Sequence, residues 1–397
     1  MNAVKIKEGV YWVGALDYNL RDFHGYTTPN GTTYNSYLIV DKKIALIDSV
    51  KAPFSEELIS RISSIVEPGK IDYLIVNHVE MDHSSSIEAV MELTKKAEIR
   101  CTKKAEEFLH AHYPASSSWS IKTVAAGDSL ILGKRRLDFI PVPMLHWPDS
   151  MFTYSKADKV LFSNDGFGQH IATGQRFSDE VKERDIFGEA QKYYANILMP
   201  YSGVAEKKLL EMKGLKIDVI CPSHGVIFRD KEDIKRITSL YEGWAGGEAK
   251  DKAVIVYDTM YDSTEKMARA IEEGLSSKGI DTRLYRLRIS DQSDAISEIL
   301  DAKAVIVGSS TLNNGVLPAV GGFLTYLLGL RPRGKIGAAF GSYGWGGGAV
   351  KTIEEHLLNT GIELPLKGFQ SKFVPDEDVL KASYKLGRDL AGHIKKR

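Results

Sequence analysis

The regular alternation of strand-like and helix-like segments after residue 252 constrains the fold of this chain more than any other feature. Strands are expected at 253–258, 282–288, 303–308, 335–341 and 369–374. Helices are expected between and after them, at 263–278, 292–300, 319–329, 348–360 and 376–394. Strict alternation of this kind is typical of an α/β fold with an open, doubly wound parallel sheet.

The part of the chain before this alternation has a different pattern. Strand-like runs occur at 10–14, 35–40, 43–48, 73–76, 136–142, 151–154, 159–162 and 217–221, and helical spacing at 55–66 and 86–95. Because 397 residues are many for one hydrophobic core, we predict two domains, at 1–247 and 248–397. Three glycines and five ionisable side chains between Glu242 and Lys252 predict a short linker.

Two histidines and two carboxylates are crowded into six residues directly after the strand predicted at 73–76. They are His78, Glu80, Asp82 and His83. Burying so many ionisable groups is costly unless a cation compensates them, so a metal site is favoured over a solvated acidic loop. In an extended loop alternate side chains project the same way. His78 and Glu80 would then hold one metal, and Asp82 with His83 a second.

Three further ligand-type side chains each follow a predicted strand. They are His146, Asp165 and His224. Loops at strand ends on a rigid scaffold can bring side chains to one point. We therefore predict that His146 and His224 complete the two half-sites and that the Asp165 carboxylate bridges them.

A second candidate site follows the strand at 253–258, where a hydroxyl-rich loop leads directly into a helix. Hydroxyl and backbone N–H groups at a helix N-terminus bind anions without lysine or arginine, although Ser263 or Thr264 as an ordinary N-cap is the alternative. The Asp262 side chain would have to point to solvent, because its carboxylate repels a bound anion. Ligands of such sheets also contact the loops after the third and fourth strands. The candidate cofactor-binding residues are Thr259, Met260, Tyr261, Asp262, Ser263, Thr264, Ser310, Thr311, Leu312, Asn313, Asn314, Gly315, Ser342, Tyr343, Gly344, Trp345, Gly346 and Gly347.

Composition excludes several other classes of protein. Lysine plus arginine and aspartate plus glutamate are equal at 52 each, so there is no basic excess for nucleic acid or an anionic membrane. The sequence contains no apolar run of membrane-spanning length and begins without a signal peptide. Cys101 and Cys221 form no C-x-x-C pair, so the expected setting is the cytoplasm. Neither a P-loop nor a G-x-G-x-x-G fingerprint follows the strand at 253–258.

The metal motif resembles that of the metallo-β-lactamase family, in which H-x-H-x-D-H binds two metals at the edge of an αββα sandwich. The later ligands of that family match His146, Asp165 and His224. Glu80 stands where the family has its second histidine, and a carboxylate there favours iron or manganese over zinc. A mixed histidine–carboxylate metal pair resembles the sites that reduce dioxygen. The resemblance leaves open whether His83 binds metal.

The hydroxyl-rich loop resembles the loop of flavodoxin that wraps the phosphate of FMN, with Tyr343 or Trp345 placed to flank the flavin ring. An N-terminal lactamase-like αββα sandwich followed by a flavodoxin-like five-stranded parallel sheet is similar to the flavodiiron proteins over essentially the whole chain. The segments 193–200, 146–149 and 342–349 (YYANILMP, HWPD and SYGWGGGA) carry the same resemblance.

That resemblance implies a non-haem diiron centre that reduces dioxygen to water, nitric oxide to nitrous oxide, or both, with electrons from FMN. It also implies a head-to-tail homodimer or a pair of such dimers. An external electron donor such as rubredoxin or a reduced deazaflavin coenzyme is expected, because the chain ends directly after its last predicted helix. His24, Tyr193, Tyr194 and Trp345 are candidates for supplying protons or shaping the substrate pocket, with simple packing as the alternative.

Two other classes of function stay open on the sequence. A hydrolase with a zinc pair would keep the same fold, and Glu80 argues against it. A pure electron carrier would need only FMN and would leave the metal-type residues unexplained.

Overall fold

The computed structural model describes residues 1–94, 96–181 and 185–397. The described chain forms two compact units. The first unit is built from Met1–Tyr193 and Gly203–Glu242, and the second from Tyr194–Ser202 and Gly243–Arg397. The short segment 194–202 therefore packs with the C-terminal part of the chain, which the sequence did not predict.

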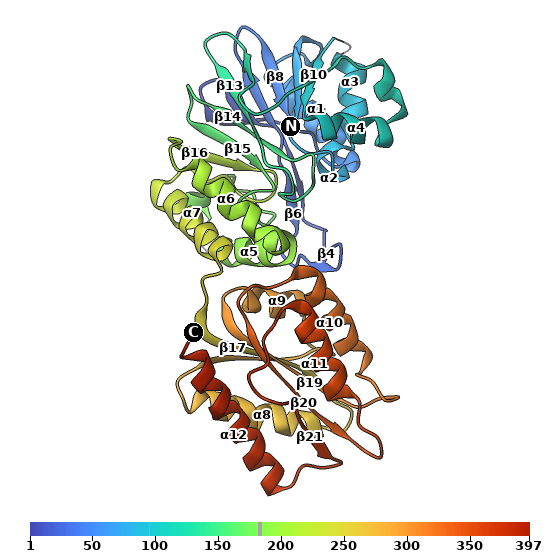
Figure 1. Cartoon of the computed structure of the whole chain (residues 1–397). Helices are drawn as coiled ribbons and strands as arrows, with labels where there is room; N and C mark the ends of the chain where they lie inside the picture. Colours follow the sequence, from blue (N-terminus) through green and yellow to red (C-terminus); the bar gives the residue numbers. More distant parts are fainter. Residues whose placement is uncertain (95, 182–184) are drawn as a thin grey trace. The chain divides into compact units, whose positions relative to one another are not determined.

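Within the described residues, two large sheets form the centre of the first unit (Figure 1). One sheet has the order β1 (Val4–Lys7), β2 (Val10–Trp12), β7 (Tyr37–Val40), β8 (Ile44–Ile47), β9 (Tyr73–Val76), β10 (Glu98–Cys101), β11 (Ile121–Thr123). The other has the order β12 (Ser129–Ile131), β13 (Arg136–Pro141), β14 (Met151–Ser155), β15 (Val160–Asn164), β16 (Val219–Pro222). Two small ribbons pair β3 (Ala15–Asp17) with β6 (Thr32–Tyr34) and β4 (Asp22–Phe23) with β5 (Tyr26–Thr27).

The apolar core of the first unit lies in two layers, one on each face of the first sheet. Alternate side chains of β7 show this division: Tyr37 and Ile39 pack between the two sheets, whereas Leu38 packs under helices. The helices on that outer face are α1 (Ser55–Ser63), α3 (Ile87–Thr94) and α4 (Lys103–His112). Beside β15 and β16 lie α6 (Ser202–Met212) and α7 (Lys231–Gly246) (Figure 1). The layers therefore follow the αββα order predicted from the metal motif.

The second unit contains one parallel sheet with helices around it. Its strands are ordered β18 (Asp281–Arg286), β17 (Lys250–Asp258), β19 (Ala302–Ser310), β20 (Ile336–Tyr343), β21 (Phe369–Lys372). Its helices are α8 (Ser263–Ser276), α9 (Gln292–Leu300), α10 (Pro318–Leu330), α11 (Ala349–Thr360) and α12 (Glu377–Ile394). Every strand and helix predicted for this part is present.

The predicted linker between Glu242 and Lys252 includes the division between the two units at Glu242 and Gly243, but regular structure covers most of it. Helix α7 continues to Gly246 and β17 already begins at Lys250. The helix continues because Trp244 and Ala245 are buried, so packing outweighs the low helix propensity of the glycines. The helix predicted at 86–95 is α3, and residue 95 lies outside the described residues.

In the described part of the chain, no helix has both the length and the apolar character that a membrane span requires.

Candidate metal centre and flavin loops

The direction of three strands explains how distant ligand-type side chains meet in the first unit. Strand β14 is antiparallel to both β13 and β15, and β16 is parallel to β15. Strands β13, β15 and β16 therefore end at the same edge of their sheet. His146, Asp165 and His224 follow these three ends.

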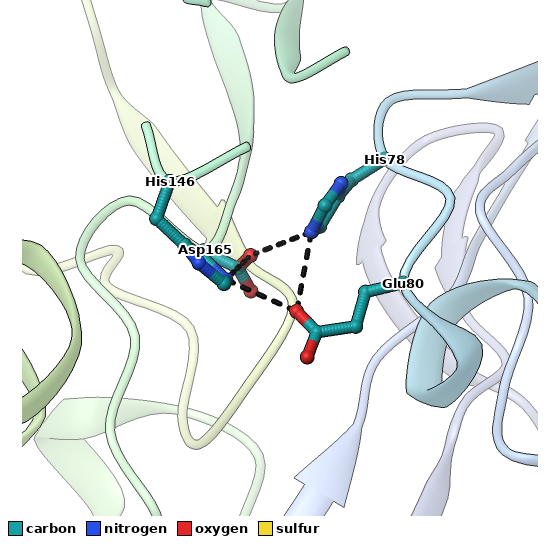
Figure 2. Close-up of side chains that lie close together, drawn as sticks. All are labelled: His78, Glu80, His146 and Asp165. Atoms are coloured by element: carbon teal, nitrogen blue, oxygen red, sulfur yellow. Dashed lines mark hydrogen bonds and ion pairs between the residues drawn. The ribbon is translucent and has the colours of Figure 1, made fainter. Parts of the chain in front are cut away.

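One group of side chains gathers around the Glu80 carboxylate (Figure 2). Glu80 Oε2 lies 3.3 Å from His78 Nε2 and 3.0 Å from His146 Nε2. Asp165 Oδ2 lies 3.3 Å from His146 Nε2 and 3.7 Å from His78 Nε2. One ligand atom from each of these four residues lies within 4.8 Å of the others, which is a distance that one metal ion can span.

A second group lies on the other side of Asp165. Asp82 Oδ2 is 3.1 Å from His224 Nε2, and Asp82 Oδ1 is 3.5 Å from His83 Nε2. Asp165 Oδ1 is 3.0 Å from His83 Nε2 and 3.7 Å from His224 Nε2. The two oxygens of Asp165 thus face different groups, which is the geometry of a bridging carboxylate. The structure brings all seven predicted metal ligands together.

Unused lone pairs indicate that these groups are arranged for a cation. Both carboxylate oxygens of Asp82, and Oδ2 of Asp165, are buried and accept no hydrogen bond from any described residue. They nevertheless lie close to imidazole nitrogens. Nitrogen and oxygen atoms that are close but not aligned with one another can direct their lone pairs at a common centre. The residues present therefore fit a metal pair.

The electrostatics of the centre favour positive charge. Burial would lower the pKa of His78, but its hydrogen bonds with Asp149 and Glu80 raise it to about 10. Burial would raise the pKa of Asp165, but His83 and His146 hold it well below its usual range. The carboxylates therefore stabilise positive charge at this position, and metal cations supply such charge.

Asp149 orients His78, and the sequence showed it only as part of the H-W-P-D segment. Its two oxygens lie 3.0 and 3.1 Å from His78 Nδ1, and Oδ2 also accepts the backbone N–H of Val79 at 2.8 Å. Since Nδ1 is engaged in this way, Nε2 is directed at the centre. His224 is held similarly, with Nδ1 2.7 Å from the carbonyl oxygen of Thr33.

A buried carboxylate ties together the loops that precede two ligands. Asp48 accepts the backbone N–H of Asn77 at 2.7 Å and its side-chain amide at 3.0 Å. It also accepts the amide of Asn164 at 3.4 Å. Asn77 directly precedes His78, and Asn164 directly precedes Asp165. Asp48 thus links the ends of β9 and β15, which belong to different sheets.

The residues predicted to supply protons or to shape the substrate pocket lie at different distances from the centre. His24 Nε2 lies 3.1 Å from Glu80 Oε1, and this hydrogen bond raises the pKa of His24. Tyr193 is buried with its ring 6.0 Å from that of His224. Tyr194 instead donates its hydroxyl hydrogen to Ser202 Oγ at 3.1 Å and packs on Trp244.

His170 belongs to the surroundings of the centre, although its sequence context did not indicate a role. It is fully buried, with its ring 4.9 Å from that of His224 and 5.1 Å from that of Tyr193. Thr32 Oγ1 lies 2.8 Å from Nδ1, and Nε2 is buried without a hydrogen-bond partner among the described residues. Burial holds the pKa of His170 well below its usual range. The position of His170 in the sequence gave no signal of this place, because only the fold brings residue 170 beside residue 224.

In the second unit, the predicted cofactor loops meet at the C-terminal edge of the sheet. The hydroxyl of Thr264 lies 3.0 Å from that of Ser310 and 2.9 Å from that of Ser342. A Cβ atom on Gly348 would lie 1.9 Å from the carbonyl oxygen of Asn314, so only glycine allows the second and third loops to approach. The hydroxyl of Thr259 is buried and has no hydrogen-bond partner among the described residues. These hydroxyls beside the start of α8 fit a phosphate group.

The two units together match known proteins of one architecture. A sequence profile described as "ODP family beta lactamase" matches residues 32–225, and one described as "Flavodoxin" matches residues 255–387. A nitric oxide reductase of Moorella thermoacetica is 52% identical over 396 residues, which cover 98% of each chain. The solved rubredoxin:oxygen oxidoreductase of Desulfovibrio gigas is 41% identical with a TM-score of 0.97, covering 100% of this chain and 99% of that one. The solved flavodiiron protein of Giardia intestinalis is 38% identical with a TM-score of 0.96, covering 100% and 97%.

A lactamase-type unit joined to a flavodoxin-type unit defines a class of two-domain oxidoreductases. The chain belongs to the flavodiiron protein family. The predicted fold class is confirmed, and so is the prediction that the protein is an oxidoreductase.

Proposed function

We propose that this chain reduces dioxygen to water, nitric oxide to nitrous oxide, or both, at a non-haem diiron centre that receives electrons through FMN. The observation that carries the proposal is Asp165, whose two carboxylate oxygens face two separate groups of ligand-type side chains. The names of the relatives in Moorella and Desulfovibrio support both substrates. The proposed metal ligands are His78, Glu80, Asp82, His83, His146, Asp165 and His224.

Iron suits this centre better than zinc because of Glu80. Its carboxylate lies between the imidazoles of His78 and His146, so oxygen and nitrogen ligands are mixed in one half-site. Such a set is harder and more anionic than an all-imidazole set. Bound iron and bound FMN would supply the electrons for the reduction.

Side chains of the chain itself would handle protons and shape the pocket. His24 reaches Glu80 from a partly exposed position, so it can exchange protons between solvent and the centre. Phe23 and Tyr193 pack against the buried His170 ring at 5.1 Å each. This aromatic wall would limit water on that side of the centre, while the neutral imidazole of His170 offers one N–H group.

Exposed apolar side chains beside the flavin loops support an assembly. Phe373 is 58% exposed and Val374 66%, next to the loop at Tyr343, and neighbouring exposed apolar side chains commonly mark an interaction surface. We propose a head-to-tail homodimer, or a pair of such dimers, in which a second copy of the chain covers these exposed side chains. Light scattering after size-exclusion chromatography tests it, and a monomer at micromolar concentration would contradict it.

We further propose rubredoxin or a reduced deazaflavin coenzyme as the electron donor, supported by the name of the Desulfovibrio relative. The cytoplasm is the proposed setting, supported by the buried free thiols of Cys101 and Cys221. The functional division is proposed at residues 1–247 for the metal domain and 248–397 for the FMN domain.

The replacement His78→Asn tests the central proposal. We expect purified wild-type protein to contain iron and FMN and to consume oxygen or nitric oxide when reduced. The variant should lose iron and gas consumption but keep a reducible flavin. His112→Asn, on the exposed face of α4, is the control and should behave as wild type. Zinc as the bound metal together with hydrolytic turnover would overturn the proposal, as would unchanged gas consumption by the variant.

A further inference from the structure

Three carboxylates surround the loop proposed to hold the phosphate of FMN. Asp258 directly precedes the loop 259–264, Asp262 lies within it, and Glu265 is in the first turn of α8. The loop itself contains no lysine or arginine. A phosphate dianion is repelled by nearby carboxylates, although the N-terminus of a helix attracts it. The hydroxyl and helix features of the loop therefore do not by themselves explain tight phosphate binding.

Two arginines from the neighbouring strand pair with these carboxylates, in addition to Arg269 of α8, which holds the other oxygen of Glu265 at 2.8 Å. Arg286, the last residue of β18, places Nη1 3.1 Å from Glu265 Oε2 and 3.6 Å from Asp262 Oδ1. Arg288, two residues further, donates from Nη2 to Asp258 Oδ2 at 3.1 Å. The pairing of β18 with β17 brings them there, because Arg286 is the register partner of Tyr257.

Two of the three carboxylates are shielded from solvent. The side chains of Asp258 and Glu265 are 1% and 17% exposed, whereas that of Asp262 is 63% exposed, so solvent screens the first two incompletely. Arg286 Nε is buried without a hydrogen-bond partner among the described residues. The unpartnered hydroxyl of Thr259, fully buried in the same loop, is an independent sign that a polar ligand belongs here.

We propose that Arg286 and Arg288 act as a counter-charge pair that neutralises the carboxylates around the loop and thereby selects a flavin that carries a phosphate. This inference rests on the proposed binding of FMN and deepens it. The pair acts through Glu265, Asp262 and Asp258, so both arginines are positioning residues. Their effect is on discrimination between FMN and riboflavin, which has the same ring system and no phosphate.

The test is titration of the full-length apoprotein with FMN and, separately, with riboflavin, followed by quenching of flavin fluorescence. Arg286→Gln and Arg288→Gln are each expected to weaken FMN binding about two- to fivefold at low salt, the scale of one charge near a helix N-terminus. Riboflavin binding should stay unchanged. The loss for FMN should shrink as salt is raised, because salt screens the uncovered carboxylate.

Matched variants separate charge from structure. Arg283→Gln removes the same charge from the same strand, but Arg283 pairs with Asp281 and Glu298 away from the loop, so it should not change FMN binding. Arg286→Lys should retain FMN binding close to wild type. The double variant Arg286→Gln with Glu265→Gln removes both members of an ion pair and should recover most of the lost affinity.

Equal weakening of FMN and riboflavin would overturn the inference and assign the arginines to the fold alone. Unchanged FMN binding in both single variants would also overturn it, while leaving the proposed cofactor intact. A wild-type apoprotein that binds neither flavin would instead contradict the proposed function itself.

Discussion

Single side chains decide which chemistry the lactamase-like scaffold of this protein supports. Glu80 replaces an imidazole by a carboxylate at the point where His78 and His146 converge. Asp165 joins the two groups because each of its oxygens faces a different histidine pair. Asp149 matters in a less direct way, since it controls which nitrogen of His78 is available.

The replacement Asp149→Asn is expected to lower metal retention about 10- to 100-fold, as is typical when the partner of a ligand histidine is changed. Asparagine keeps only one acceptor oxygen for two donors, His78 Nδ1–H and the Val79 backbone N–H. The tautomer that directs a free Nε2 to the centre is therefore less stabilised. Metal content after dialysis against a graded chelator measures the effect. Asp138→Asn, which affects only an exposed pair with Arg136, is the control, and equal metal loss in both variants would contradict the role.

Lys335 in the second unit predicts a dependence of stability on pH. Burial lowers the pKa of Lys335 from 10.5 to about 8, and its ammonium donates to the carbonyl oxygen of Leu300 at 2.9 Å. Below pH 8 both folded and unfolded states are protonated, so the folded state bears the full cost of a buried charge. As pH rises from about 8 to 10.5 this cost disappears, and stability should increase by about 3 kcal/mol.

Lys335→Met removes that charge. We expect the variant to be more stable than wild type at pH 7 by about 1–2 kcal/mol, after loss of one hydrogen bond worth roughly 1 kcal/mol. Thermal unfolding at a series of pH values measures this. The stability gain should vanish near pH 10, and a variant that is less stable at pH 7 would show that the lysine is stabilised by its surroundings.

At the scale of elements, the ends of strands place the chemistry in both units. The candidate metal ligands follow β9, β13, β15 and β16, and the cofactor loops follow β17, β19 and β20. Helices α8 and α12 contact each other so closely that two positions require glycine. A Cβ atom on Gly274 would lie 2.1 Å from the carbonyl oxygen of Tyr384, and one on Gly387 2.2 Å from that of Ile271.

Gly274→Ala is therefore expected to destabilise the second unit by about 1–3 kcal/mol, because the two helices must move apart. Flavin release on heating, followed by fluorescence, reports this loss. Gly392→Ala lies on the same helix pair, where no described atom would be within 4 Å of the added Cβ. It should be neutral or slightly stabilising. Equal shifts for the two variants would contradict the close-packing explanation.

At the scale of the whole molecule, the chain consists of two units with separate cores. The sheets of the first unit and the parallel sheet of the second share no strand. Metal and flavin are proposed to bind to different units, so each would stabilise mainly the unit that holds it.

Thermal unfolding of protein from which metal has been removed tests this independence. A metal present at about a hundred times its dissociation constant adds about 2.7 kcal/mol to the free energy of unfolding. Chelation should therefore lower the unfolding temperature of the first unit clearly. The temperature of flavin release should change little. Flavin removal is the reciprocal experiment. A single transition that moves equally in both cases would show that the units unfold together.

Local patterns carried most of the prediction for the second unit. The central strands β17, β19 and β20 are largely apolar runs and most of the helices are amphipathic, so neighbours in sequence determine most of these elements. The candidate metal ligands stood out in the sequence because ionisable groups at strand ends need compensation wherever the strands lie. The local pattern did not show that helix α7 extends to Gly246, since the burial of Trp244 and Ala245 depends on distant residues.

By itself, the sequence determined the two-unit architecture, the ligand types and the hydroxyl-rich loop, because these depend on local periodicity and on residue chemistry. Only the tertiary structure decided that Asp165 faces both groups, that His170 lies beside His224, and that Arg286 pairs with Glu265. Each of these contacts joins residues from different elements. Their geometry follows from sheet order and register, which long-range packing sets.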